Sequence, residues 1–236
     1  MTRLVAFYQS SIGKKITISL TGLFLCSFLI VHLVGNLLLL KNDGGAAFDA
    51  YSTFMSTNGA IRLLEVGLVL GFLAHIVSGV TVWWQNRQAR PAKYDTYRLK
   101  DNAPIWARYA WVTGGIVFIF LAIHLQTFVV GLRFVDEKPS AYALVAQAFS
   151  SGWYSAWYVA ALVLLAYHLR HGFQSGFQTL GLRNKRYTGL IDAVAVIFWL
   201  IIPIGFAVIP IYFYFFHNVA VATMVVTFGS SILFFI

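Results

Sequence analysis

Residues 16–40 read ITISLTGLFLCSFLIVHLVGNLLLL, an apolar run with no acidic or basic side chain apart from one histidine. A membrane-spanning helix needs about 20 consecutive apolar residues, so this run is long enough to cross a bilayer. Four further mostly apolar runs follow, at residues 62–84, 105–131, 153–177 and 190–216. We therefore predict an all-α protein, a polytopic transmembrane helical bundle with five spans.

The composition of the whole chain agrees with a membrane protein of one domain, residues 1–236. Hydrophobic residues make up 59% and charged residues 11% of the chain, whereas a soluble domain carries about 25% charged residues. The net charge of +9 fits loop residues that set topology and meet anionic lipid, so we expect no nucleic-acid partner. A single cysteine, Cys26, excludes an internal disulfide and a cysteine-ligated cluster.

The basic residues are divided unevenly between the two ends of the spans. One end carries Arg3, Lys14, Lys15, Arg87, Arg90, Lys93, Arg98, Lys100, Arg108, Arg170, Arg183, Lys185 and Arg186. The other end carries Lys41, Arg62, Arg133 and Lys138. The positive-inside rule then predicts a cytoplasmic N-terminus in a multi-pass protein of the cytoplasmic membrane.

The segments outside the first four spans carry weaker signals. The connections 41–61 and 132–152 each hold a short amphipathic stretch. Pro203 and Pro210 should kink the fifth helix or end it early. Residues 219–236 are apolar but interrupted by glycine and serine, which indicates a membrane-associated extension, with a sixth crossing as the alternative.

One histidine lies inside each of the first four runs: His32, His75, His124 and His168. A neutral imidazole is costly in hydrocarbon unless it has a partner, so such residues indicate a function. A helix rise of about 1.5 Å per residue places His32 and His124 in the outer half and His75 and His168 in the inner half. Two stacked imidazole pairs match the axial ligands of two b-type haems. The alternative is four core histidines that hydrogen-bond across helices.

An internal repeat supports the same pairing. Thr21 and Gly22 precede His32 with the spacing at which Thr113 and Gly114 precede His124, and Gly79 and Gly172 follow His75 and His168 by four residues. A glycine one turn from a ligand leaves room for a flat macrocycle. Gly22 and Gly114 would lie at the level of the inner pair and leave room for the other haem. The alternative is that these glycines only pack helices.

The inner end of the fourth span offers a further histidine. His171 follows His168 by three residues and is either an alternative ligand, a donor to a haem propionate, or a solvated interfacial residue. Arg170, Lys14, Lys15 and Arg87 are the other propionate candidates.

These residues resemble the cytochrome b subunit of succinate dehydrogenases and fumarate reductases, the respiratory complex II family, in its single-subunit, five-helix, dihaem branch. The resemblance covers nearly the whole chain, from T-G-L-F-L-x6-H-L at residues 21–33 to H-L-R-H-G-F-Q-S-G-F-Q-T-L-G at residues 168–181. It implies one haem ligand from each of the first four helices, and it favours His168 over His171. Some fumarate reductases of this branch carry a glutamate two residues before the fourth ligand; here that residue is Ala166, so that proton route is not expected.

The resemblance also implies partners and a place in the tricarboxylic acid cycle. A flavoprotein subunit and an iron–sulfur subunit would dock on the cytoplasmic face, and dicarboxylate chemistry would take place on the flavoprotein. This chain would carry electrons between the iron–sulfur subunit and a quinone, which the dihaem branch suggests is menaquinone. The alternative is a dihaem cytochrome b anchor of another quinone-linked dehydrogenase or hydrogenase. Succinate oxidation and fumarate reduction use the same wiring, so both directions stay open.

A quinone site needs polar groups near a haem at the rim of the bundle. Asn58, Arg62 and Glu65 lie near the start of the second span, and Glu65 is about 15 Å from His75 along the helix, at the outer level. Glu65 is a candidate proton relay, or it pairs with Arg62 one turn away. Asn36, four residues after His32, could donate to a quinone carbonyl or a propionate. A quinone site near the inner haem is the alternative.

Overall fold

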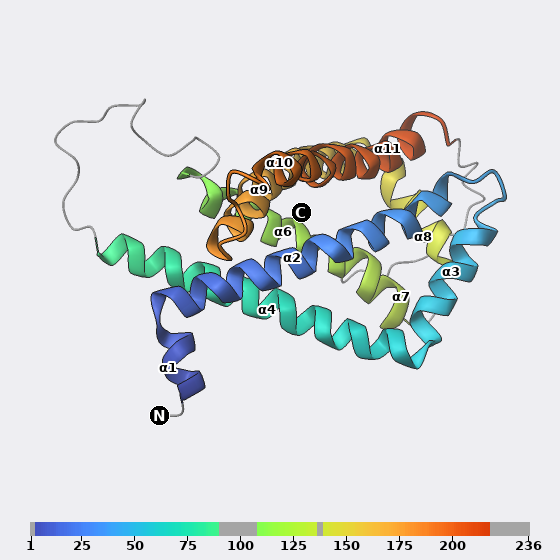
Figure 1. Cartoon of the computed structure of the whole chain (residues 1–236). Helices are drawn as coiled ribbons and strands as arrows, with labels where there is room; N and C mark the ends of the chain where they lie inside the picture. Colours follow the sequence, from blue (N-terminus) through green and yellow to red (C-terminus); the bar gives the residue numbers. More distant parts are fainter. Residues whose placement is uncertain (1–2, 90–107, 136–138, 218–236) are drawn as a thin grey trace.

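The computed structural model describes residues 3–89, 108–135 and 139–217, and these residues form helices without any strand (Figure 1). The elements are α1 (Arg3–Gln9), α2 (Ser11–Asn36), η1 (Leu37–Leu40), α3 (Ala46–Thr57), α4 (Gly59–Gln88), α6 (Ala110–His124), η3 (Leu125–Val130), α7 (Gly131–Arg133), α8 (Ala141–Ser150), α9 (Gly152–Thr179), α10 (Thr188–Val196), η4 (Ile197–Ile201) and α11 (Ile202–Phe215). The prediction of an all-α protein is confirmed.

Four continuous helical segments are long and apolar enough to cross a membrane: Ser11–Leu40, Gly59–Gln88, Ala110–Arg133 and Thr188–Phe215. A fifth candidate combines α8 and α9, which meet at an angle of 97°. Each of the five predicted runs lies on one of these segments. The helices reach further than hydropathy suggested, because polar caps start them: the Ser10 hydroxyl accepts from the Gly13 N–H, and the Asn58 side chain accepts from Ala60 and Ile61.

The short amphipathic stretches predicted in the connections 41–61 and 132–152 are the helices α3 and α8. They lie together at the end of the bundle where α2 and α11 also arrive (Figure 1). A buried apolar cluster joins them there, with Leu39, Phe48, Phe149 and Phe213 among its members. These two helices therefore close one end of the bundle.

The fifth span does not end early at its prolines. Residues Ile197–Ile201 form a π-helical turn in which the Ile202 N–H donates to the Ile197 carbonyl, and Pro203 follows in the first turn of α11. Proline has no N–H to donate to the preceding turn, and the π-helical turn lies just before Pro203. Pro210 is fully buried inside α11, and the helix continues to Phe215. The predicted extension 219–236 and the predicted start of the third span at residue 105 lie outside the described residues.

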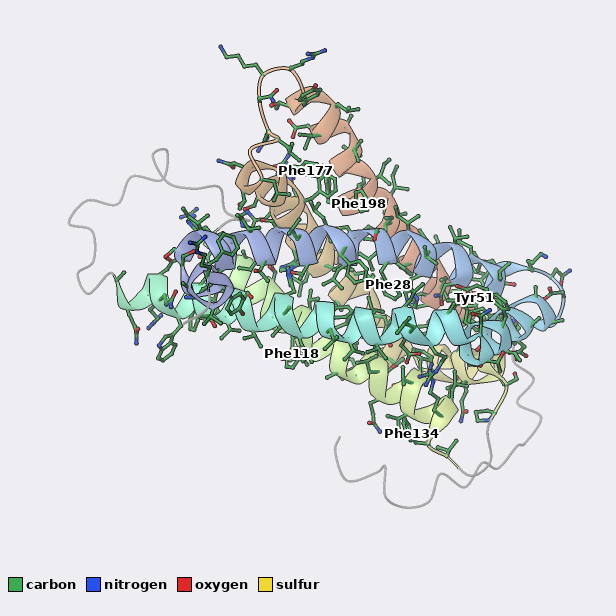
Figure 2. The ribbon with its side chains drawn as sticks, turned by 60° about the horizontal axis from the view of Figure 1, so that its bottom comes forward. Phe28, Tyr51, Phe118, Phe134, Phe177 and Phe198 are labelled. Atoms are coloured by element: carbon green, nitrogen blue, oxygen red, sulfur yellow. The ribbon has the colours of Figure 1, made fainter. Side chains whose placement is uncertain are left out.

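The packing of the long helices is uneven. α2 packs closely against α4 and α9, and α9 packs against α6 and α11. α4 makes little contact with α6. A second apolar cluster, with Cys26, Phe173 and Phe198 among its members, joins α2, α9 and η4. Figure 2 shows Phe28 near the middle of the bundle, with Tyr51 toward the α3 end and Phe177 and Phe198 at another extremity. The side of the bundle between α4 and α6 is thus the loosely packed one.

Candidate functional site

The structure brings His32 on α2 and His124 at the end of α6 together. Their ring centroids are 5.8 Å apart and their planes meet at 86°. Aromatic rings enclose them: Phe28 stacks on His32 with a centroid separation of 5.1 Å, and Phe128 lies 5.2 Å from His124. The next turn of α2 adds Asn36, whose amide nitrogen donates to the His32 carbonyl at 2.8 Å and lies 3.4 Å from His32 Nδ1. These two imidazoles form what we call the outer pair.

The structure also brings His75 on α4 and His168 on α9 together, as an inner pair. Their ring centroids are 6.3 Å apart, with an interplanar angle of 81°. His75 Nδ1 lies 3.2 Å from the Ile18 carbonyl oxygen and 3.3 Å from Thr21 Oγ1, both on α2. The His168 ring lies near the Ala110 carbonyl on α6. Its Nδ1 atom is buried and forms no regular hydrogen bond.

The separation of the inner pair is close to that of imidazoles that share a metal, and the outer pair is closer together. With about 2 Å for each metal–nitrogen bond and about 1.1 Å from nitrogen to ring centre, two opposed imidazoles have centres about 6.2 Å apart. The ring planes of both pairs meet nearly at right angles, at 81° and 86°. In His75 and His124 the Nδ1 atom already faces a hydrogen-bonding partner. Nε2 is therefore the nitrogen left for a metal in these two rings.

The donor set also indicates which kind of metal group fits. The two pairs consist of histidine side chains only. A haem iron brings four equatorial nitrogens of its own and takes its remaining ligands from the protein. Two imidazoles at each place are the protein donors that a bis-histidine haem would take.

The glycines one turn from the inner pair are uncrowded. A Cβ atom added at Gly79 or at Gly172 would meet nothing within 4 Å, and Gly172 is exposed. All four histidines are half-buried, and α4 packs only lightly on α6. A glycine beside a histidine lets a flat group approach the helix. The imidazole pairs therefore supply the protein donors that two bis-histidine haems would take.

Gly22 and Gly114 lie beside the histidine rings of the inner pair. A Cβ at Gly22 would lie 3.2 Å from His75 Cε1, and a Cβ at Gly114 would lie 3.2 Å from His168 Cε1. These glycines make room for the imidazoles of the inner pair. The equal distances follow from the internal repeat. α2 and α6 carry a glycine at equivalent residues, and the histidine ring of a neighbouring helix packs against each glycine.

The predicted quinone-site residues separate into three groups. The Asn58 side chain caps α4, where it accepts from Ala60 N–H at 3.0 Å. Asn36 faces His32. Arg62 and Glu65 form the pair expected as the alternative, with Arg62 Nη1 2.6 Å from Glu65 Oε2. The structure thus brings only Arg62 and Glu65 into direct contact among these four candidates.

Arg133 is a partner of Glu65 that the sequence reasoning missed. Its Nη1 lies 2.5 Å from Glu65 Oε1 and its Nη2 lies 3.2 Å from Oε2, so the guanidinium binds both carboxylate oxygens. This contact ties the start of α4 to α7, at the end of the third span, across the loosely packed side. The available signal was that both residues were placed at the outer level, Arg133 by the distribution of basic residues and Glu65 by its distance from His75 along the helix.

We expect the Glu65–Arg133 contact to contribute little to stability, because both side chains are about one-third exposed (33% and 31%). Exposed ion pairs contribute less than about 1 kcal/mol. The coupling is measured by thermal unfolding in detergent of Glu65→Gln, Arg133→Gln and the double variant. A coupling energy above about 3 kcal/mol would instead indicate a buried, structural pair.

The propionate candidates lie in two separate places. Lys14 and Lys15 line a pocket of about 370 Å³ between α2 and α4, and Lys14 Nζ donates to Gln85 Oε1 at 3.1 Å. Arg87 lies on the same end of α4, 6.0 Å over the Trp83 ring. Arg170 lies 4.9 Å over the Trp199 ring, toward η4. His171 is half-buried on α9, one turn beyond His168.

Tyr158 lies beside His124 and is another residue that the sequence reasoning missed. Its hydroxyl lies 3.2 Å from His124 Nδ1. The signal for it was its spacing: Tyr158 precedes His168 by ten residues, as Glu65 precedes His75.

Comparisons of the chain with protein-family models, with curated proteins and with solved structures found no match. The evidence for a function is the geometry of the site: two imidazole pairs lie between helices, most of which are long and apolar enough to cross a membrane.

Proposed function

We propose that the chain is a dihaem cytochrome b, the membrane-anchor subunit of a succinate:quinone oxidoreductase. It would carry electrons between an iron–sulfur subunit and a membrane quinone, of which menaquinone is the favoured type. The observation that supports this most is the pairing of four histidines from four helices into two sets, with ring centroids 5.8 Å and 6.3 Å apart. Such a pairing is the arrangement that two bis-histidine sites would require.

Each residue of the two pairs has a defined role in this proposal. His32 and His124 would hold the outer haem, and His75 and His168 the inner one. When bound, the haems would supply iron centres that accept and release one electron each. The Ile18 carbonyl and the Thr21 hydroxyl orient the His75 ring, and the surrounding apolar side chains exclude water, which tunes the site.

The basic residues at one end of the bundle support the docking of soluble partners there. The exposed Lys15 lies where α2 begins and the exposed Arg87 where α4 ends, while Lys14 is buried between these helices. A flavoprotein and an iron–sulfur subunit, on which the dicarboxylate reaction would take place, would dock at this cytoplasmic end. Anionic lipid headgroups are the other partner that such a basic surface attracts.

The proposal is tested by an absorbance spectrum of the purified chain, reduced minus oxidised, together with a haem count. We expect two low-spin b haems per chain, because two sites are built from two imidazoles each. A colourless intact preparation, or one haem per chain, would contradict the proposal.

Co-purification separates the two candidate kinds of complex. Recovery of a flavoprotein and a ferredoxin-like iron–sulfur subunit with succinate:quinone activity would support complex II. Recovery of another dehydrogenase or of a hydrogenase would support the alternative anchor role, with the same haem ligands.

A further inference from the structure

The outer and inner pairs differ in what holds their rings. His75 of the inner pair is held by a backbone carbonyl and a threonine hydroxyl of α2. His124 of the outer pair is held by the side chain of another helix, because the Tyr158 hydroxyl on α9 lies 3.2 Å from its Nδ1. This contact is the observation from which the inference starts.

Tyr158 is held firmly in place. The residue is only 5% exposed. Its ring packs edge-to-face against Phe120 and Phe149, each with a centroid separation of 4.9 Å. Its hydroxyl also lies 3.0 Å from the Tyr154 hydroxyl. The phenol therefore has little freedom to leave His124, and the hydrogen bond has a fixed direction.

A short chain of hydroxyls continues from Tyr158 toward the start of α9. The Tyr154 hydroxyl is 2.8 Å from Thr127 Oγ1 on η3. Tyr154 has one hydroxyl proton, and donating it to Thr127 leaves the Tyr154 oxygen to accept the hydroxyl proton of Tyr158. The oxygen of Tyr158 then accepts from the Nδ1–H of His124.

The two halves of the internal repeat differ in this contact. Glu65 occupies in α4 the place that Tyr158 occupies in α9, ten residues before the inner histidine. Glu65 is bound by Arg62 and Arg133, while the neighbour of His32 Nδ1 is Asn36 at 3.4 Å. The two halves of the bundle thus differ at equivalent residues. Of the two outer histidines, His124 has a tyrosine hydroxyl beside its Nδ1, whereas His32 has an amide group.

We infer that Tyr158 is a positioning residue for the outer haem, an inference that rests on the proposed function. Its hydroxyl accepts the Nδ1 proton of His124, which selects the tautomer whose Nε2 is available to the iron. A ligating histidine that donates its other N–H becomes a more basic ligand. A more basic ligand stabilises the oxidised iron, so Tyr158 lowers the reduction potential of the outer haem without affecting the inner one.

The test is the Tyr158→Phe variant of the full chain in its complex, titrated potentiometrically with absorbance detection. Phenylalanine keeps the aromatic packing and removes the hydroxyl. We expect both haems to remain, and the equilibrium constant for reduction of the outer haem to rise about tenfold, which is about 59 mV for one electron. The inner haem should not change. The outer haem is identified as the one missing from His32→Ala.

Tyr154→Phe is the matched control, because its hydroxyl bonds to Tyr158 and Thr127 but not to His124. We expect a shift well below that of Tyr158→Phe. Fluorotyrosine at residue 158 is the second variant, in case phenylalanine impairs assembly. It keeps the shape but weakens the oxygen as an acceptor, so it should shift the outer haem in the same direction by a smaller factor.

Two results would overturn the inference. One is an unchanged outer potential in Tyr158→Phe with both haems present. The other is an equal shift in Tyr154→Phe or at the inner haem, because that would reflect general packing. A wild-type preparation without haem would instead overturn the proposed function, so the two failures are distinguishable.

Discussion

Replacement of His75 or His168 by alanine is expected to remove the inner haem and leave the outer one, so that the haem count falls from two per chain to one. Replacement of His32 or His124 should remove the outer haem instead. The reason is that in the proposed function each pair would hold its own haem, and the rings of a pair are only 5.8 Å or 6.3 Å apart. The measurement is the haem count with the reduced-minus-oxidised spectrum.

His171→Ala is the control for the ligand assignment on α9. His171 lies one turn from His168 and is half-buried, but the ring within 6.3 Å of His75 is that of His168. We expect His171→Ala to keep both haems. If it removed a haem while His168→Ala kept both, the assignment of His168 would be wrong.

Replacement of Gly114 by valine is expected to have the next largest effect. A Cβ at Gly114 would already lie 3.2 Å from His168 Cε1, and the two methyl groups of valine need more room. Overpacking a tight site costs about 1 to 3 kcal/mol, and here the atom that must move belongs to a haem ligand. We expect inner-haem occupancy to fall strongly while the outer haem is retained.

The adjacent glycine provides the matched control. A Cβ at Gly115 would meet nothing within 4 Å, although both residues lie on α6 and a valine has the same helix propensity at either. Gly115→Val should therefore keep two haems per chain. Equal haem loss in both variants would mean that a β-branched residue disturbs α6 itself and that the contact with His168 is not the cause.

The number of apolar helices and the levels of the histidines followed from local properties of the chain. The length of an apolar run sets whether a helix can cross a membrane. The constant rise of a helix converts residue spacing into depth. Those two rules predicted the run at residues 16–40, the short helices α3 and α8, and the shared depth of the histidines in each pair. Each rule concerns a single helix, so no knowledge of neighbours was needed.

The contacts between helices depended on the tertiary structure, because helix rotation and packing are set by residues far apart in the chain. Whether Gly22 faces a haem or His75 depends on how α2 and α4 turn toward each other. The Arg133 contact with Glu65 and the Tyr158 contact with His124 join residues separated by 68 and 34 positions. Hydropathy contains no signal for such pairs, and the spacing of Tyr158 gives its place on α9 but not its partner. The chain therefore specified its helices and the depth of its histidines locally, while the partners of each side chain arose only when the helices packed.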